Sequence, residues 1–194
     1  MDALNKSYWN DRYLNEQTGW DIGHVSTPIK AYIDQLENKE LKILIPGAGN
    51  AWEAEYLHSS GFSNVHVLDI SPAAIKQFVE RVPEFPREHI HEGDFFQHDQ
   101  KYDLILEQTF FCALDPKLRN QYALKMHELL NNGAKLVGLL FNFPLTDQGP
   151  PFGGSQEEYH NLFKNLFDIQ TIQLAHNSIA PRQGNELFIQ LIAK

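Results

Sequence analysis

Two glycines and an aspartate have the spacing of a site that binds a nucleotide-type ligand. Gly47 and Gly49 follow the apolar run 41–45, and Asp69 ends the next apolar run, 65–69. Glycine lets the backbone turn sharply and approach a ligand closely, because no Cβ stands in the way. Asp69 comes roughly 20 residues after Gly47, the spacing at which an acid accepts hydrogen bonds from ribose hydroxyls. The sequence therefore predicts a site for a ligand that carries adenosine.

The glycine turn differs from two other phosphate-binding turns. No Gly-Lys-Ser or Gly-Lys-Thr sequence follows the glycines, which excludes an ATP phosphate loop. Trp52 and Glu53 stand where a dinucleotide site would have its third glycine, and a pyrophosphate needs close backbone approach there. An NAD-dependent reductase therefore stays an alternative, but the missing third glycine disfavours it.

Further polar and aromatic residues follow the third and fourth predicted strands. Asp94 and Phe95 follow the third strand, Gln108 ends the fourth, and Cys112 comes shortly afterwards. Asp94 offers a carboxylate to an amino group, and Phe95 offers a ring to cover a base. Ligands of parallel sheets bind beyond the carboxyl ends of the strands, so we expect these residues to meet the glycine turn at one edge. Cys112 is interpreted as a buried thiol beside the site rather than as a covalent nucleophile.

Three histidines near the third strand have a superficial likeness to a metal site. His89, His91 and His98 lie close to Asp94 in the sequence. Neither a helical His-Glu-x-x-His pattern nor a cysteine pair accompanies them. We therefore expect no metal site.

The N-terminal segment, residues 1–27, is polar but rich in aromatic residues. Trp9 and Tyr13 are four positions apart and so share one face of a helix, and Trp20 follows them. One interpretation is a helix held against the core by its rings, and the other is a lid that closes over a ligand. The sequence leaves both interpretations open.

The elements that must position these residues follow from the apolar pattern. Strands are expected at 41–45, 65–68, from His89, and at 102–106, 135–141, 167–174 and 187–192, with helices after Thr27, at 51–60, and after Ser71, Asp115 and Ser155. The pair Asn132-Gly133 predicts a stop and turn, and Ser155 with Glu158 predicts a capping box. Strands alternate with helices until two strands close the chain. This order predicts an α/β fold with a doubly wound, mostly parallel sheet and a late antiparallel strand.

Length and composition narrow the class of protein. With 194 residues, 42% hydrophobic and 21% charged, we expect one domain spanning residues 1–194. The net charge of −9 disfavours a nucleic-acid partner, and no apolar run reaches membrane-spanning length. The first residues lack the apolar core of a signal peptide, and the single cysteine cannot form an internal disulfide. We expect a cytoplasmic monomer or weak dimer that acts on a small molecule.

Several segments together resemble the thiopurine S-methyltransferase family of class I S-adenosylmethionine (SAM) methyltransferases. The resemblance extends over nearly the whole chain and is closest to the halide, thiol and thiocyanate methyltransferase branch. The aromatic arm and the two C-terminal segments are the most specific to the family. The segments that carry it are Trp9, Gly19-Trp20-Asp21, 45–49, 68–71, 93–96, 110–114, Gly149-Pro150-Pro151-Phe152 and 178–182, which includes Ala180-Pro181-Arg182.

The resemblance implies a Rossmann-like, seven-stranded methyltransferase sheet with its last strand antiparallel and helices on both faces. It also implies a lid of residues 1–27 over SAM, the product being S-adenosylhomocysteine. The substrate pocket would be formed around Gln108, Cys112, Phe152 and Arg182. By its chemistry, Arg182 could steer an anionic acceptor or be a solvated loop cation, and both interpretations stay open. Cofactor contacts are implied for Trp9, Tyr13, Trp20, Gly47, Gly49, Asp69, Ile70, Asp94, Phe95 and Gln108.

The chemistry implied is the in-line transfer of a methyl group to a thiol, thiopurine, halide or thiocyanate. Such a nucleophile needs mainly to be held about 3 Å from the methyl group and shielded from water. The chain departs from the family in having Tyr13 where the plant branch has Trp, and Ala48 where Cys is common. Gln108 replaces an Arg or Tyr of relatives, so the substrate is not carried over from them. The acid that many class I enzymes place just before the glycine turn is absent, since Ile45-Pro46 occupies that place.

Two alternatives to this methyltransferase hypothesis stay open. One is the NAD-dependent reductase, although the short chain leaves little room for a separate substrate domain. The other is a SAM-binding module that has lost turnover, for instance through Gln108. Cofactor binding without a methylated product would distinguish the silent module from an enzyme.

Overall fold

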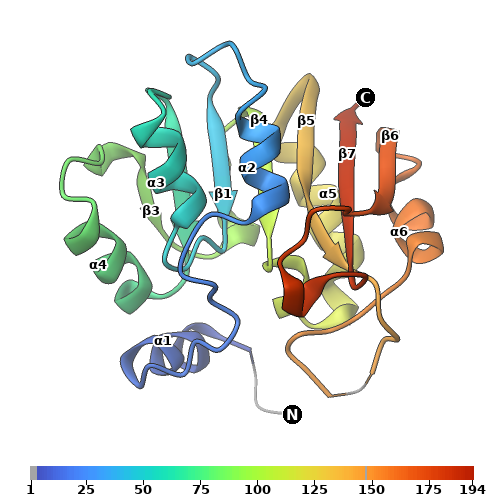
Figure 1. Ribbon diagram of the computed structural model, residues 1–194, viewed down its shortest axis with the longest axis horizontal. Coiled ribbons are helices and arrows are strands. Elements are labelled where there is room, and N and C mark those ends of the chain that lie inside the picture. The colour runs from blue at the N-terminus through green and yellow to red at the C-terminus, as the bar shows by residue number, and fades with distance from the viewer. Residues whose placement is uncertain (1–3, 147) are drawn as a thin grey trace.

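A seven-stranded sheet crosses the middle of the molecule, and helices cover both of its faces (Figure 1). The computed structural model describes residues 4–146 and 148–194. The strand order is β3-β2-β1-β4-β5-β7-β6, and β7 pairs antiparallel with both of its neighbours, whereas β1 to β5 pair in parallel. The predicted mostly parallel sheet is therefore confirmed. The strands are β1 (Ile43–Pro46), β2 (Val65–Asp69), β3 (Ile90–Glu92), β4 (Tyr102–Gln108), β5 (Leu130–Phe141), β6 (Phe167–Leu174) and β7 (Glu186–Ala193).

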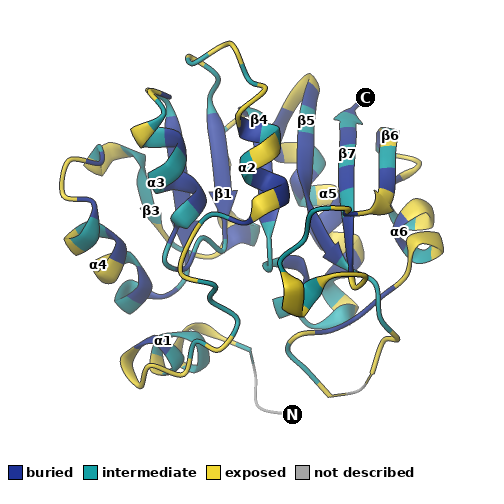
Figure 2. Cartoon of the chain, viewed as in Figure 1, coloured by how far each residue is buried: buried dark blue, intermediate teal, exposed yellow. Residues whose placement is uncertain are grey.

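Each face of the sheet has its own apolar core. On one face, α2 (Thr27–Ile33), α3 (Trp52–Ser59) and α4 (Pro72–Arg81) contribute Ile33, Leu57 and Phe78. On the other, α5 (Arg119–Leu129) and α6 (Gln156–Phe163) contribute Met126 and Phe163. Strands β1 and β2 are buried along their length, whereas the helices are buried only on the sides that face the sheet (Figure 2). Burial on both faces explains the continuous apolar runs of β1 and β2.

The N-terminal arm lies beyond the carboxyl ends of the parallel strands. Its helix, α1 (Lys6–Leu14), packs beside α4 and below β1 in the view of Figure 1. The loop from α1 to α2 then climbs along the sheet edge at which β1, β2 and β4 end (Figure 1). This arrangement places the arm opposite the carboxyl ends of these strands (Figure 1).

Three local predictions were wrong in detail. Asn132-Gly133 does not end the helix in a separate turn, because Leu130 already pairs with Tyr102 and the residues up to Lys135 bulge from β5. Asp115 caps a short 3₁₀ turn, and α5 begins only after it. Ser155 does accept a hydrogen bond from the Glu158 amide, at 3.2 Å, but the Glu158 carboxylate pairs with Arg119 instead of closing the capping box.

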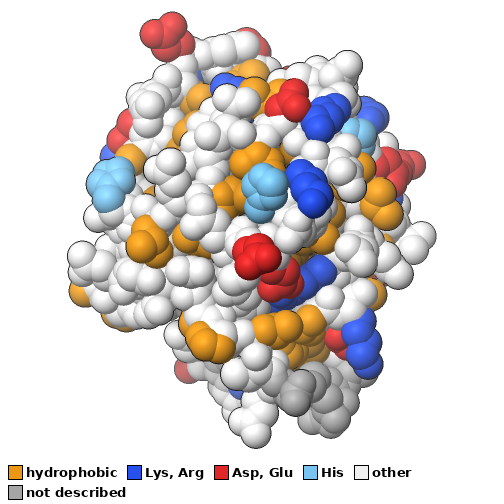
Figure 3. Space-filling view, turned by 90° about the vertical axis from the view of Figure 1, so that its right-hand side faces the viewer, with side chains coloured by type: hydrophobic (Ala, Val, Ile, Leu, Met, Phe, Trp, Pro, Cys, Tyr) orange, Lys and Arg blue, Asp and Glu red, His pale blue; other side chains and the backbone are white. Residues whose placement is uncertain are grey.

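The surface carries charges of both signs. On the side next to β6 and α6, acidic and basic side chains are interspersed with hydrophobic ones (Figure 3). Within residues 4–146 and 148–194, no helix combines the length and apolarity needed to cross a membrane.

Candidate active site

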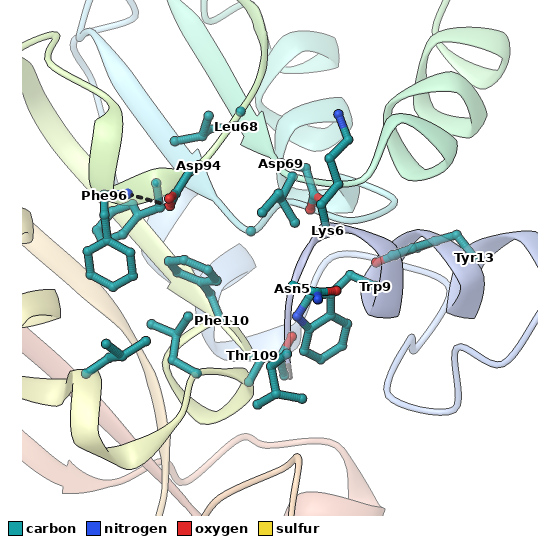
Figure 4. Close-up of a pocket in the computed structure, with 18 of the residues that line it drawn as sticks. Asn5, Lys6, Trp9, Tyr13, Leu68, Asp69, Asp94, Phe96, Thr109 and Phe110 are labelled. Atoms are coloured by element: carbon teal, nitrogen blue, oxygen red, sulfur yellow. Dashed lines mark hydrogen bonds between the residues drawn. The ribbon is translucent and has the colours of Figure 1, made fainter. Parts of the chain in front are cut away.

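A cavity of about 310 Å³ opens between the arm and the carboxyl ends of the parallel strands (Figure 4). Its volume lies in the range of sites that bind small molecules. We call it the first cavity. Most of the residues expected to contact a cofactor line it: Trp9, Tyr13, Trp20, Gly47, Asp69, Ile70, Asp94 and Phe95.

Gly47 of the glycine turn lines this cavity, and Gly49 lies close by in the same turn. Gly47 and Gly49 have φ angles of +58° and +55°, which favour glycine. A Cβ added at Gly47 would lie 2.2 Å from the ring of Phe110, and one at Gly49 would lie 2.3 Å from the hydroxyl of Tyr13. Both glycines are therefore required by the backbone and by the rings that pack against it.

Asp69 ties the glycine turn to the end of β2. One carboxylate oxygen accepts the Gly49 amide at 2.8 Å, and the other accepts the Ser71 amide, also at 2.8 Å. The carboxylate is buried, and burial raises its pKa. Each oxygen keeps a further lone pair, so Asp69 can also accept hydrogen bonds from the hydroxyl groups of a ligand.

Asp94 and Phe95, which follow β3, also line the first cavity. Asp94 caps a short 3₁₀ helix by accepting the Phe96 amide at 2.9 Å, the dashed bond in Figure 4. The buried ring of Phe95 packs edge-on against Phe110, with 5.1 Å between the centroids. The Asp94 carboxylate is exposed beside the cavity and is available to a ligand.

Contacts within the arm, and hydrogen bonds from the arm to the rest of the protein, hold it over the cavity. Trp20 packs edge-on against Trp9 and Tyr13, with centroid distances of 5.6 and 5.9 Å. Asp21 accepts a hydrogen bond from the indole N–H of Trp52 at 2.7 Å. Arg182 donates to the backbone carbonyl of Trp20 at 2.6 Å, which joins the arm to the segment before β7. The arm thus packs as a helix, and its rings Trp9, Tyr13 and Trp20 line the first cavity, whereas closure of the arm as a lid over a ligand stays a prediction.

A second cavity, of about 420 Å³, lies on the other side of Trp9 and Trp20. Cys112 and Arg182, two of the candidate substrate residues, line it. Burial raises the pKa of the Cys112 thiol, whose Sγ donates to the carbonyl of Thr109 at 3.4 Å. Cys112 is therefore a neutral thiol in the wall. The other lining residues are Tyr8, Arg12, Gln17, Gly19, Thr109, Ala113, Phe141, Pro150 and Pro151.

Phe152, the third substrate candidate, lies behind the wall of the second cavity. Its side chain is buried, and its ring packs against Gly149. Its amide donates to the carbonyl of Cys112 at 2.8 Å. Phe152 thus holds the loop whose prolines, Pro150 and Pro151, face the cavity.

A third, small cavity of about 50 Å³ lies beside the glycine turn. Gln108 lines it, and its amide oxygen accepts a hydrogen bond from Ser26 Oγ at 3.3 Å. Gly49 and Glu53 are also in its wall. Trp20 and Thr109 line all three cavities, which therefore meet at these two residues.

Glu107 organises this meeting point, although it was not among the site residues predicted from the sequence. Its fully buried carboxylate accepts the amides of Phe110 and Phe111, both at 2.9 Å, and the hydroxyl of Tyr122 at 2.6 Å. These bonds hold the loop in which Thr109 has a φ of +57°. Burial raises the pKa of Glu107 to about 7. An acid inside an apolar strand was the available signal, because such a group must find buried donors.

The histidines pack against one another at the edge of the sheet. In the part of the chain that the structure describes, no three His, Cys, Asp or Glu residues are placed to hold a metal ion. His66, which the sequence analysis did not include, lies 3.0 Å from His91 between ring nitrogens. His89 is in a 3₁₀ turn, not in β3 as expected. Burial lowers the pKa of His66 to about 3 and that of His91 to about 4, so both rings are neutral near pH 7.

Known proteins are similar to this chain in sequence and in fold. The profile of the family described as Thiopurine S-methyltransferase (TPMT) matches residues 4–189. "Probable thiol methyltransferase 2" of Arabidopsis thaliana is 31% identical over 96% of this chain and 84% of its own length. "Thiocyanate methyltransferase 1" of Brassica oleracea is 26% identical over 95% of this chain and 84% of its own. Among solved structures, 1,6-didemethyltoxoflavin-N1-methyltransferase of Burkholderia thailandensis, with bound S-adenosylhomocysteine, superposes with a TM-score of 0.74 at 16% identity, covering 99% of this chain and 88% of that one.

Proposed function

The chain belongs to the thiopurine S-methyltransferase family, and from this premise we propose that it transfers the methyl group of SAM to a small soft nucleophile. The predicted family, methyltransferase activity and cofactor are confirmed by the family match. The family gives no support to the alternative of an NAD-dependent reductase. What the family leaves open is the acceptor and the roles of individual residues.

The meeting of three cavities at Trp20 and Thr109 supports a specific arrangement of the two substrates. The first cavity would take the adenosine part, with Asp69 accepting from the ribose and Asp94 and Phe95 beside the base. The third cavity would take the amino-acid part, and the second would take the methyl acceptor. The reacting atoms would then meet beside Trp20 and Thr109.

The residues of the chain fit SAM. SAM supplies a methyl group bound to a sulfonium cation, which is electrophilic without activation by the protein. The turn at Gly47 and Gly49 allows close approach, and the rings of Trp9, Tyr13 and Trp20 exclude water. Such rings also favour a nearby cation by roughly 0.5–2 kcal/mol each. The protein's contribution is therefore to bind, orient and dehydrate the reacting groups.

The lining of the second cavity supports the class of acceptor. Among the described residues that line it there is no carboxylate and no imidazole, and the Cys112 thiol is neutral. Arg12 and Arg182 are its charged groups. With no general base in the wall, the acceptor must enter already ionised or be strongly nucleophilic without losing a proton. Thiolates, thiopurines, halides and thiocyanate meet this requirement.

Calorimetry and product analysis test the function together. We expect SAM and S-adenosylhomocysteine to bind, and mass spectrometry to detect a methylated product from at least one thiol, thiopurine, halide or thiocyanate. Hydroxylated aromatics serve as the control class and should give no product. No cofactor binding at hundreds of micromolar would contradict the proposal, and binding without any product would favour the silent SAM-binding module.

Other predictions from the sequence stay predictions. They are the single domain over residues 1–194 with its lid at 1–27, the cytoplasmic location, and the monomeric or weakly dimeric state. The first three residues of that lid lie outside the described range. Sedimentation of the purified protein at several concentrations measures the oligomeric state directly.

A further inference from the structure

Glu53 is a buried acid in the wall of the third cavity. It is the second residue of α3, and its relative exposure is only 6%. Within the described residues, its carboxylate accepts one hydrogen bond from another residue, from the Ser26 amide at 3.2 Å. A buried carboxylate with so few bonds is costly unless a further donor or cation meets it.

The two other acids near the glycine turn are better satisfied. Asp21 accepts from the Gly23 amide and the Trp52 indole, both at 2.7 Å, and also from Asn50. Asp69 accepts two backbone amides. Among the acids at this turn, Glu53 is therefore the one with the greatest capacity left for a ligand.

The surroundings of Glu53 narrow the kind of group that it can bind. The third cavity, about 50 Å³, exceeds the roughly 10–15 Å³ of accessible volume that one water molecule needs, and is far too small for a base or a ribose. It shares Gly47 and Tyr13 with the first cavity. A small cationic group attached to a ligand in the first cavity would therefore reach it.

We propose that the Glu53 carboxylate binds the α-ammonium group of the methionine moiety of SAM, an inference that rests on the proposed function. Ile45-Pro46 occupies the place where many class I enzymes have an acid before the glycine turn. Glu53 supplies a negative charge from the other side of that turn. An ammonium has three donors and a full charge, so it satisfies the carboxylate that the protein leaves nearly unpaired.

Two ligands that differ in the amino-acid part provide the test. S-adenosylhomocysteine carries the ammonium, whereas 5′-methylthioadenosine keeps the adenosine and thioether but lacks the amino-acid part. In calorimetry at neutral pH, Glu53→Gln should weaken S-adenosylhomocysteine at least tenfold and change 5′-methylthioadenosine less than twofold. The matched control is Glu55→Gln, which removes the same charge from the same helix turn beside Arg81 and should leave both affinities within twofold.

Proton release gives an independent measurement. Burial is the main cause that raises the pKa of Glu53 in the free protein. The Asp21 carboxylate also raises it, and backbone amides and the Arg182 guanidinium lower it, so pairing with an ammonium should lower this pKa further. In slightly acidic buffers of different ionisation enthalpy, S-adenosylhomocysteine should release protons from the wild-type protein in excess of any released by 5′-methylthioadenosine. Glu53→Gln should abolish the excess.

The outcomes separate this inference from the function that it assumes. If neither ligand binds the wild-type protein, the proposed function fails. If both bind and Glu53→Gln weakens them equally, or weakens neither, the function stands and the role of Glu53 is wrong. Should the variant not fold, the wild-type protein decides, because an S-adenosylhomocysteine analogue that lacks only the α-amino group should bind at least tenfold more weakly. Equal affinity for the analogue overturns the inference.

Discussion

The first and second cavities share a wall of tryptophans but are built in different ways. In the first cavity, Asp69 bonds to the amide of Ser71 and Asp94 to that of Phe96, each two residues further along the chain. In the second, Arg182 reaches the carbonyl of Trp20 across 162 positions. The cofactor end is thus organised mainly by turns and caps, and the acceptor end by contacts between distant segments.

This difference bears on how the two ends can change. A turn with positive φ angles and backbone-bonded acids tolerates few substitutions, because each residue is constrained by its own neighbours. A wall assembled from separate loops can change one loop at a time. We therefore expect substitutions in the first cavity to affect cofactor binding and stability together, and substitutions in the second to affect the acceptor alone.

The largest effect is expected from Gly47→Ala, which should distort the glycine turn at the first cavity. The new Cβ would lie 2.2 Å from the Phe110 ring at a φ of +58°. The free energy of unfolding should fall by about 2–5 kcal/mol, and S-adenosylhomocysteine binding should be lost. The control is Gly133→Ala, with φ +78° and no atom within 4 Å of the new Cβ, which should cost about 1–2 kcal/mol. If urea denaturation gave the same loss of unfolding free energy for both variants, Phe110 would move aside and the turn would be less constrained than we infer.

Glu107→Gln tests the loop that joins the two cavities, through its dependence on pH. The folded protein holds the Glu107 proton up to about pH 7, whereas the unfolded chain loses it near 4.5. The contribution of Glu107 to stability is therefore fully present below pH 4.5 and is lost as pH rises to about 7, by about 3 kcal/mol. Relative to Glu107→Gln, the wild-type free energy of unfolding should fall across this window and stay level above it. Parallel profiles for the two proteins would contradict the raised pKa.

Asp69→Ala should weaken S-adenosylhomocysteine by about 1–3 kcal/mol, through loss of bonds to the ribose. Asp103→Ala is the matched control, because Asp103 also accepts a backbone amide, that of Lys42 at 3.0 Å, but at the other end of the sheet. Calorimetry should show unchanged affinity in this control. Unchanged affinity in Asp69→Ala as well would place the ribose elsewhere.

The smallest effect is expected from Arg182→Met, which tests whether the second cavity binds the acceptor independently of the cofactor. The change removes a cation from the second cavity, its ion pair with the buried Glu186 at 3.3 Å, and the bond to the Trp20 carbonyl. The KM of an anionic acceptor should rise about tenfold, equivalent to about 1.4 kcal/mol, while the Kd of S-adenosylhomocysteine stays within twofold. Arg182→Lys, which keeps the charge, should recover part of the loss. A matching loss in cofactor affinity would mean that Arg182 serves both cavities by holding the arm.

Local patterns were enough to predict that several of the candidate residues meet at one edge of the sheet. The apolar runs, the glycine turn and the acids at strand ends are short-range features, and Gly47, Asp69 and Asp94 do meet in one cavity. Phe152 could not be placed in this way, because whether a loop residue faces a cavity or lies behind its wall depends on its packing partners.

The mostly parallel sheet, the glycine turn and the family could be predicted from the sequence, because periodicity, turn residues and motifs lie in neighbouring positions. Three features of the site emerged only from the folded chain: Trp20 and Thr109 stand between three cavities, Glu107 holds the loop beside them, and Glu53 is buried with few hydrogen bonds. Burial and hydrogen-bond satisfaction depend on segments that meet only when the chain folds, so no local pattern encodes them.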